Sequence, residues 1–319
     1  MASRPWSSRA RRALLTALVT MSVALPVSGA ARPAAVPAPA PAALAPLGTA
    51  DPSALDSRYA AGREEIRAAR DMAARHGDRR RAAALTGMSG SGRTFLMFDG
   101  RDGGRSVEVF GDLSRARRIA VLVPGAGVDL DHYGRLRRGA EALLGELGSG
   151  SAVVAWLGYR TPATLGPSSL TAGRADGAAP RLRAFVRELA VAVPAARVSL
   201  LCHSYGSVVC ARAASGLDVA DIVLYGSPGT GAGSAAGLHT RATVRAGLGG
   251  EDWIARIPHT TLPLPFVTVG FGTDPTAPEF GAEVFDAGDA GHSGYLRPGS
   301  VSLRSIAGIV AGRAGGRHA

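Results

Sequence analysis

The sequence contains no lysine, asparagine or glutamine, and only two cysteines occur among its 319 residues. Its 36 Lys/Arg residues are therefore all arginines, opposed by 25 acidic residues, which gives a net charge of +11. A bias this wide is typical of G+C-rich coding, so the arginine count says little about partners. Two cysteines exclude a disulfide scaffold and a four-cysteine zinc site. No run of twenty apolar residues is present, which excludes an ordinary polytopic membrane protein.

The chain has enough apolar side chains to build a large core. Apolar residues make up 46% and charged residues 19%, and 319 residues suit one large α/β domain or at most two small ones. The positive charge is spread thinly, and no stripe of interleaved aromatic and basic residues occurs, so no nucleic acid is expected as a partner. No cofactor and no metal ion are expected either.

Residues 1–30 have the pattern of a secretory signal peptide. Arginines without any acid precede an apolar run from Ala13 to Leu25, and Val27–Ala30 follow as the cleavage region. The run is short for a stable membrane span, although an uncleaved anchor is the alternative interpretation. Arg11-Arg12 resembles a twin-arginine signal. The pattern predicts a secreted or cell-surface protein, a location with which cell-wall association is compatible.

Two segments follow before the predicted main domain. Residues 31–50 are rich in proline and alanine, which favours an extended linker with no core to join. In residues 51–90, apolar side chains recur at helical spacing at Leu55, Tyr59, Ile66 and Ala69. This periodicity predicts an N-terminal helical segment. Its run Arg79–Arg81 could contact an acidic surface, but a solvated helix end is the favoured interpretation.

Residues 91–313 alternate predicted strands and helices, and residues 314–319 form a tail. A hairpin comes first, and apolar runs typical of buried strands follow: Thr94–Asp99 with Ser106–Gly111, then Ile119–Pro124, Ala152–Tyr159, Val198–Cys202, Ile222–Tyr225, Ala242–Leu248, Phe266–Gly270 and Ala282–Asp286. Helical stretches lie at Tyr133–Leu147, Pro180–Ala192, Tyr205–Ser215 and Val301–Ala311. This order predicts an α/β fold with a mostly parallel sheet, helices on both faces and an N-terminal hairpin. Active residues are then expected at the carboxyl ends of the strands.

The strongest local pattern is Leu200–Ser207, where a predicted buried strand runs directly into Ser204 and a helix follows. It matches the nucleophile elbow G-x-S-x-G, with Cys202 in place of the first glycine and Gly206 as the second. Small residues are needed at these positions because larger side chains would collide with the neighbouring strand and helix. Ser204 is therefore the candidate nucleophile, with its Oγ exposed at the positive end of the helix.

A nucleophilic serine needs a base, and His292 is the candidate among the seven histidines. It lies in a glycine-rich loop after the last predicted strand, where this arrangement places its base. An acid between Ser204 and His292 in the chain should orient the imidazole. Asp252 and Asp274 both qualify, because each follows a predicted strand. Asp252 is favoured because no strand is skipped before it, and Asp274 is kept as the alternative acid.

Backbone amides are expected to stabilise the oxyanion of the reaction. One should come from Tyr205, the residue after the nucleophile. The other should come from the loop Pro124–Val128, where Ala126 is the first choice and Gly127 the second. A phosphate cradle is the alternative interpretation of this loop, but it lacks a lysine and the full G-x-G-x-x-G pattern.

The two cysteines are expected to be buried free thiols. Cys202 ends a predicted strand, and Cys210 is expected two turns into the helix that follows. That placement would put their Cα atoms too far apart for a disulfide.

Several motifs together extend beyond the elbow: Val121–Gly127, His203–Ser207, Tyr225–Gly229, Phe271–Pro275 with Pro278–Gly281, and Gly291–Tyr295. On these residues the chain resembles the α/β-hydrolase superfamily, and more closely a family of uncharacterised actinobacterial hydrolases. The resemblance implies an α/β-hydrolase fold, the order serine, acid, histidine, and a hydrolase activity, but it implies no particular substrate. The chain departs from that family at Cys202, where glycine is usual, and in the turn Glu251–Ile254.

The leading hypothesis is a secreted serine hydrolase, esterase-like or lipase-like, that works through an acyl-enzyme on Ser204, His292 and Asp252. Its substrate would be a small-molecule or lipid ester. An acyltransferase on the same three residues is one alternative, and a catalytically inactive hydrolase-like binding protein of the cell surface is another. The segment 253–281 is rich in proline and glycine, and Pro263–Phe266 suggest a partly apolar rim, with loop packing as the alternative.

Overall fold

The computed structural model describes residues 36–164 and 166–313, and one eight-stranded sheet carries its fold. The strands are β1 (Thr94–Asp99), β2 (Arg105–Gly111), β3 (Arg118–Val123), β4 (Ser151–Leu157), β5 (Arg197–His203), β6 (Asp221–Tyr225), β7 (Thr243–Gly247) and β10 (Glu283–Val284). Their order across the sheet is β1-β2-β4-β3-β5-β6-β7-β10. The β1–β2 and β2–β4 pairs are antiparallel, and all the remaining pairs of this sheet are parallel. The predicted signal peptide and tail lie outside the described residues.

Alternate residues of the central strands point into two separate cores. In β3, Ile119, Val121 and Val123 belong to the core on one face, and Ala120 and Leu122 belong to the core on the other. All five side chains are at most 1% exposed. Strands buried on both faces need apolar residues at every position, which is why these runs could be recognised in the sequence.

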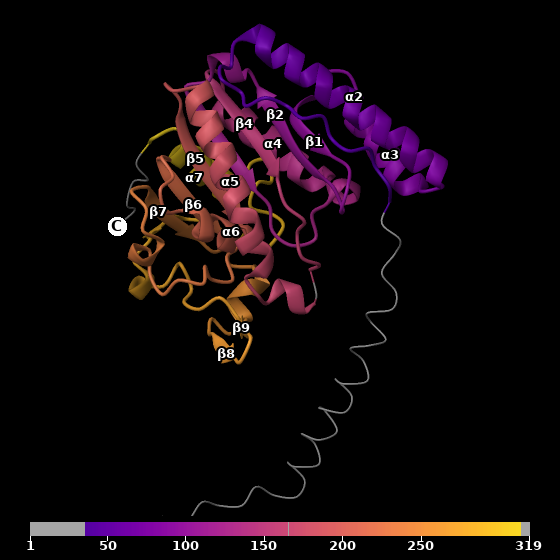
Figure 1. The fold of residues 1–319 in the computed structure, drawn as a ribbon. Helices are drawn as coiled ribbons and strands as arrows, with labels where there is room; N and C mark the ends of the chain where they lie inside the picture. The colour runs from indigo at the N-terminus through magenta and orange to yellow at the C-terminus, as the bar shows by residue number, and fades with distance from the viewer. Residues whose placement is uncertain (1–35, 165, 314–319) are drawn as a thin grey trace, which may run out of the picture. The chain divides into compact units, whose positions relative to one another are not determined.

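Helices cover both faces of the sheet (Figure 1). They are α2 (Pro52–His76), α3 (Arg79–Met88), α4 (Gly134–Leu147), α5 (Gly173–Ala192), α6 (Gly206–Ala213) and α7 (Val301–Val310). Apolar side chains of α5 and α6 fill one core, and those of α4 and α7 fill the other. The helix α2 packs on β1 at the edge of the sheet. The predicted α/β fold with a mostly parallel sheet and a leading hairpin is therefore confirmed. None of the described helices is both long and apolar enough to cross a lipid bilayer.

The helix α5 begins earlier than the sequence predicts. Pro180 was expected at its start, but the helix runs from Gly173 and contains Pro180 in its interior. Its first half packs small side chains tightly, since Ala175 and Ala178 are both 0% exposed. One amide of the first turn is also satisfied from outside, because the Ala175 N–H donates to the Tyr205 hydroxyl at 3.2 Å. Packing here outweighs the local cost of an interior proline.

The proline-rich segment is more firmly attached than a free linker. Residues 36–50 have no regular secondary structure, yet Leu47 and Ala50 are only 7% and 5% exposed and belong to one of the cores. The Ala50 amide also donates to the carbonyl oxygen of Ala192 at 3.1 Å. The expectation that this segment joins no core is wrong for these residues, because two isolated apolar positions give no periodic pattern.

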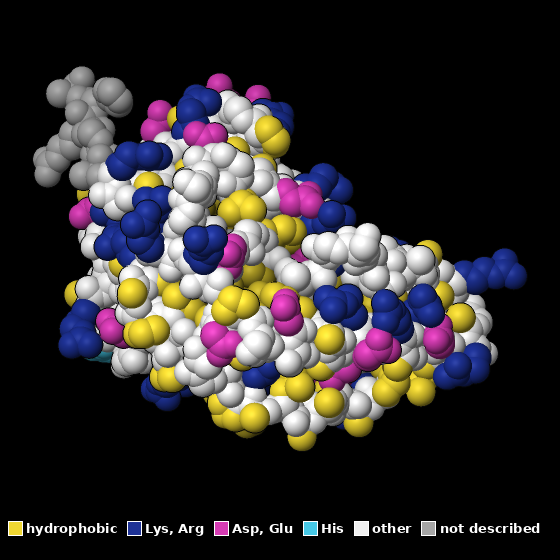
Figure 2. Space-filling model, turned by 90° about the horizontal axis from the view of Figure 1, so that it is seen from above, with side chains coloured by type: hydrophobic (Ala, Val, Ile, Leu, Met, Phe, Trp, Pro, Cys, Tyr) yellow, Lys and Arg dark blue, Asp and Glu magenta, His cyan; other side chains and the backbone are white. Residues whose placement is uncertain are grey.

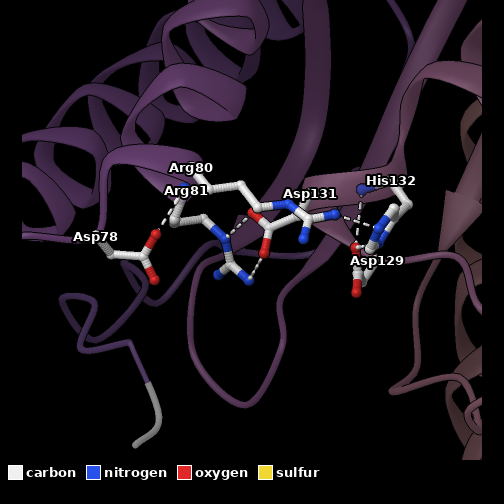
Figure 3. Close-up of polar contacts among 6 residues, drawn as sticks. All are labelled: Asp78, Arg80, Arg81, Asp129, Asp131 and His132. Atoms are coloured by element: carbon white, nitrogen blue, oxygen red, sulfur yellow. Dashed lines mark hydrogen bonds and ion pairs between the residues drawn. The ribbon is translucent and has the colours of Figure 1, made fainter. Parts of the chain in front are cut away.

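The arginines that begin α3 bind the loop after β3 (Figure 3). Arg81 is 6% exposed, and its guanidinium contacts both carboxylate oxygens of Asp131 at 2.6 and 3.1 Å. Arg80 contacts the ring of His132, whose backbone and ring nitrogens lie 2.8 Å from Asp129 Oδ1. The interpretation of a solvated helix end is therefore wrong for Arg81. These contacts fix the loop that continues from the predicted oxyanion segment.

The region 262–269 differs from the strand predicted at Phe266–Gly270. It forms a separate two-stranded antiparallel hairpin, β8 (Leu262–Leu264) and β9 (Val267–Val269), which projects beyond the main sheet (Figure 1). The strand predicted at Ala282–Asp286 is present as β10 and is only two residues long. Its parallel pairing with β7 brings the following loop to the carboxyl edge of the sheet.

Candidate active site

Ser204 occupies a strained turn between β5 and α6. Its φ is +52°, a left-handed conformation that residues other than glycine rarely adopt. The Ser204 amide donates to the carbonyl oxygen of Tyr225 at 3.0 Å, which anchors the turn to β6. Gly206 is required by close approach, because a Cβ there would lie 2.3 Å from the carbonyl oxygen of Val123. This is the geometry that the elbow pattern predicts.

His292 lies in the loop between β10 and α7, and its ring faces Ser204. The distance from its Nε2 to the Ser204 Oγ is 3.0 Å. The Ser204 residue is 8% exposed and the His292 side chain is 16% exposed, so both remain open to a small molecule. A serine hydroxyl hydrogen-bonded to an imidazole nitrogen has the arrangement that allows proton transfer from the hydroxyl to the ring.

Asp252 completes a continuous chain of hydrogen bonds. Its two carboxylate oxygens lie 3.0 and 3.1 Å from His292 Nδ1, and its side chain is fully buried. It also accepts from the Ile254 amide at 2.9 Å and from the Tyr295 hydroxyl at 2.7 Å. Burial by itself raises the pKa of this carboxyl, but the hydrogen bonds from His292, Ile254 and Tyr295 outweigh it and hold the pKa below its usual value.

Asp274, the alternative acid, lies outside this group. Its Oδ1 accepts hydrogen bonds from the amide and the hydroxyl of Thr276 at 2.8 and 2.9 Å. Its other oxygen is 4.0 Å from His259 Nε2. Among the described residues it makes no hydrogen bond to His292. The strand before Asp274 belongs to the outlying hairpin, so the loop that carries it does not start from the main sheet.

The loop after β3 lies against the nucleophile. A Cβ at Gly125 would be 2.6 Å from the Cβ of Ser204. Within residues 36–164 and 166–313, the amides of Ala126 and Tyr205 donate to no protein acceptor. The amide of Gly127 is occupied instead, since it donates to the carbonyl oxygen of Pro162 at 2.9 Å. Gly127, the second choice for the oxyanion site, is therefore corrected: its amide is occupied, whereas those of Ala126 and Tyr205 have no acceptor among the described residues.

Two residues that support the group were not identified from the sequence. Tyr295 donates to Asp252 and also accepts from the Gly249 amide at 3.0 Å, so it joins both sides of the acid loop. His203 donates from Nε2 to the backbone carbonyl oxygen of His292 at 2.7 Å. Burial, and then the nearby His292, lower the pKa of His203 to about 3, so this ring is neutral at ordinary pH. The sequence did offer a signal for both residues: His203 directly precedes Ser204, and Tyr295 lies in the same motif as His292.

The two cysteines form a disulfide, so the expectation of two free thiols is wrong. Cys202 and Cys210 have a Cα–Cα distance of 6.3 Å, within the range that a disulfide spans. The helix α6 begins only at Gly206, so Cys210 lies little more than one turn into it rather than two. The sharp turn at Ser204 then folds that first turn back against the end of β5. Both cysteines are 0% exposed.

A cavity of about 910 Å³ opens beside His292 on the side of α4. Its walls include Val128, Leu136, Trp253 and Leu296, and the Trp253 ring lies 4.8 Å from the His292 ring. Charged residues of both signs line its mouth: Arg135, Arg138, Arg297, Glu141, Glu251 and Asp289. Among the described residues, no group of three or more His, Cys, Asp and Glu side chains could hold a metal ion. The cavity therefore offers apolar walls and a mixed polar mouth to a ligand.

Comparison with known proteins gives a family match and several fold matches. A family model described as α/β hydrolase matches residues 99–262. The uncharacterized protein Rv2079 of Mycobacterium tuberculosis is 30% identical over 254 residues, which cover 68% of this chain and 38% of that protein. The uncharacterized protein Rv0963c of the same species is 33% identical over 135 residues, or 38% of this chain and 50% of that protein. The chain thus spans half or less of the length of these relatives.

Solved structures with a similar fold include two hydrolases. One is XC6422 from Xanthomonas campestris, described as an α/β serine hydrolase without a lid, with a TM-score of 0.45, 19% identity, and coverage of 70% of this chain and 95% of that one. The other is the esterase LipW from Mycobacterium marinum, with a TM-score of 0.43, 16% identity, and coverage of 78% and 90%.

Proposed function

Because the chain belongs to the α/β-hydrolase family, we propose that it is a serine hydrolase that cleaves carboxylic esters. One observation carries the proposal: Ser204, His292 and Asp252 form an unbroken chain of hydrogen bonds at the carboxyl edge of the sheet. Each member has the contact that its task requires. A hydroxyl touches a base, and the base touches a buried carboxylate.

The reaction follows from these contacts. The Ser204 Oγ attacks the ester carbonyl carbon while its proton moves to His292 Nε2. The tetrahedral intermediate then loses its alcohol, which takes that proton, and an acyl-enzyme ester remains on Ser204. Water, which gives a proton to the same nitrogen, attacks the acyl carbon. The acid leaves, and the proton returns to the Ser204 oxygen. Asp252 holds the ring in the required tautomer and stabilises its charged form.

The developing oxyanion needs donors that have no other partner. The amides of Ala126 and Tyr205 meet this condition among the described residues, and the loop of Ala126 lies against Ser204. Two preorganised amides near the reacting carbon are the usual means of stabilising such a charge, and loss of one donor costs about 10²–10³-fold in rate. Their availability supports acyl transfer over a role in binding alone.

The disulfide supports the secreted location that residues 1–30 predict, which we include in the proposal. Disulfides persist in oxidising compartments and are rare in the reducing cytosol of most bacteria. The bond between Cys202 and Cys210 flanks the proposed nucleophile on both sides. An exported enzyme would keep this bond, because the compartments outside the cytosol are oxidising.

A panel of p-nitrophenyl esters with short and long acyl chains tests the proposal, with Ser204→Ala as the matched variant. We expect turnover by the parent protein and a loss of at least about 10³-fold in kcat/KM in the variant, because the nucleophile is removed. A fluorophosphonate probe should label the parent and leave the variant unlabelled. Absence of both turnover and labelling would contradict the proposal and favour a binding protein. Labelling without turnover would retain the nucleophile and reject simple esters as the substrate class.

A further inference from the structure

The hairpin β8–β9 exposes large apolar side chains to an unusual degree. Phe266 at its tip is 101% exposed, and Leu262, Leu264 and Val267 are 59%, 46% and 42% exposed. Leu262 pairs with Val269, and Leu264 pairs with Val267, so the side chains of Leu262, Leu264 and Val267 lie on one face of the ribbon. Single exposed apolar residues are ordinary, but a contiguous group of them marks an interaction surface.

The hairpin also lacks charge. Residues 257–273 contain no aspartate, glutamate or arginine, in a chain with 19% charged residues. The face seen in Figure 2, which looks down from the side away from the hairpin of Figure 1, has basic and acidic side chains interspersed with small apolar patches. A partner that binds the hairpin is therefore not selected by charge of either sign.

The shape of the hairpin favours a fluid apolar phase over another folded chain. The second face of the ribbon is exposed as well, since Pro263 and Thr268 are both exposed. A rigid partner would cover one face, whereas a lipid layer surrounds an inserted tip on every side. Pro263 and Pro265 supply no amide hydrogen, so the edge of β8 lacks donors that an added strand from another chain would need.

The base of the hairpin is attached to the nucleophile's own turn. Phe271, directly after it, packs edge-on against the ring of Tyr205 at a centroid distance of 5.6 Å. The amide of Gly270 donates to the carbonyl oxygen of Leu170 at 2.9 Å, and the Leu170 side chain is itself 51% exposed. Tyr205 in turn donates to the carbonyl oxygen of Thr171 at 2.7 Å. A surface bound by the hairpin would therefore lie beside the reactive serine.

We propose that the β8–β9 hairpin, with Phe266 as its tip and Leu170 at its base, inserts into a lipid surface and holds the active site against it. The docking rests on the exposed hairpin alone. Its consequence, that the ester cleaved is one presented by a lipid layer, rests on the proposed function. The binding is driven by burial of apolar side chains, so it depends little on salt concentration.

The cysteine content provides a clean test. Both cysteines of the sequence are joined in the disulfide, so Phe266→Cys creates the only free thiol for an environment-sensitive fluorophore. Val191→Cys is the matched control, because Val191 is 65% exposed and lies near the C-terminal end of α5, whereas Leu170 lies just before the start of that helix. With phosphatidylcholine vesicles, the full-length protein labelled at position 266 should gain at least twofold in emission with a blue shift. The protein labelled at position 191 should not change.

Vesicle sedimentation of the full-length protein is the second measurement. Phe266→Asp should lower the partition coefficient at least tenfold, and Val191→Asp should leave it unchanged. A fluorophore at position 266 that stays water-exposed on vesicles would overturn the proposal. A shift without vesicles that grows with protein concentration would also overturn it, in favour of a second copy as the occupant. Neither measurement involves turnover, so failure of the esterase proposal and failure of the docking proposal are separate results.

Discussion

Two consecutive segments after β7 differ in how far they bury their side chains and in the hydrogen bonds that their acids receive. In residues 248–256 the side chain of Asp252 is completely buried. It accepts from Ile254 of its own segment and from His292 and Tyr295 of the loop after β10. Residues 257–276 expose the apolar side chains of the β8–β9 hairpin. Their one acid, Asp274, keeps 26% of its side chain exposed and binds its own neighbour Thr276. Both acids follow short strands, and the sequence offered both as candidates, with Asp252 favoured and Asp274 as the alternative.

The difference lies in the hydrogen bonds that each carboxylate receives, and it bears on which acid suits the proposed role beside His292. A position after a strand is not enough, because Asp274 has that too. Asp252 is distinguished by the donors that converge on it, which keep it charged despite burial. The hydrogen-bond donors to Asp274 come from its neighbour Thr276 alone among the described residues, and the hairpin before it presents apolar side chains outward. The predictions below test this contrast.

The largest effect should come from removing the charge of the buried acid. Asp252→Asn keeps the shape of the side chain but no longer stabilises the imidazolium of His292, so kcat should fall about 10³–10⁴-fold on a soluble ester. Steady-state kinetics at saturating substrate measure this loss. Asp274→Asn is the matched substitution in the exposed segment and should change kcat less than about twofold. Comparable losses in the two variants would show that the contrast between the acids is wrong.

A smaller effect is expected from removing one donor to the acid. Tyr295→Phe deletes the hydroxyl that joins Asp252 to the Gly249 amide, while His292 and Ile254 still hold the carboxylate. Loss of about 1–2 kcal/mol of positioning corresponds to roughly a tenfold lower kcat/KM. The apparent pKa of the acid limb of the pH–rate profile should also move, because the network around the base is altered. An unchanged profile together with lower thermal stability would assign Tyr295 a purely structural role.

The smallest effect at neutral pH concerns His203. Its pKa is lowered to about 3 in the folded protein, whereas an unfolded histidine titrates near 6.5. The unfolded chain therefore binds more protons between these values, and the free energy of unfolding falls as the pH drops from about 6.5 towards 3, by up to about 1.4 kcal/mol per pH unit. Urea unfolding at pH 7 and pH 4.5 measures this loss. His203→Gln should reduce it, and substitution of the exposed His76 by Gln should not.

The sequence predicted the parts of the fold and site that depend on local pattern. Strands buried on both faces produce unbroken apolar runs, as in β3 and β5, and the tight turn at Ser204 demands small neighbours. His292 could be proposed as the base because a glycine-rich loop after the last strand is a recognisable context. Asp252 was favoured and Asp274 kept as the alternative, since only the sheet order shows which of the two preceding strands belongs to the main sheet.

Contacts between distant segments could not be read in the same way. Arg81 pairs with Asp131, and Tyr295 holds Asp252, across separations of 50 and 43 residues, and no periodicity records such pairs. The disulfide was missed because the expected position of Cys210 depended on where α6 begins. Gly127 stayed a candidate donor because nothing in the sequence indicates that its amide donates to the carbonyl oxygen of Pro162.

The disulfide also restricts which substitutions positions 202 and 210 can accept during evolution. Cys202 stands where a nucleophile elbow ordinarily has glycine, and its sulfur is bonded to that of Cys210. Loss of either partner alone would leave an unpaired thiol buried in the core, either two residues from Ser204 or in the helix that follows. Positions 202 and 210 are therefore expected to mutate as a pair, with glycine and a small apolar residue as the alternative combination.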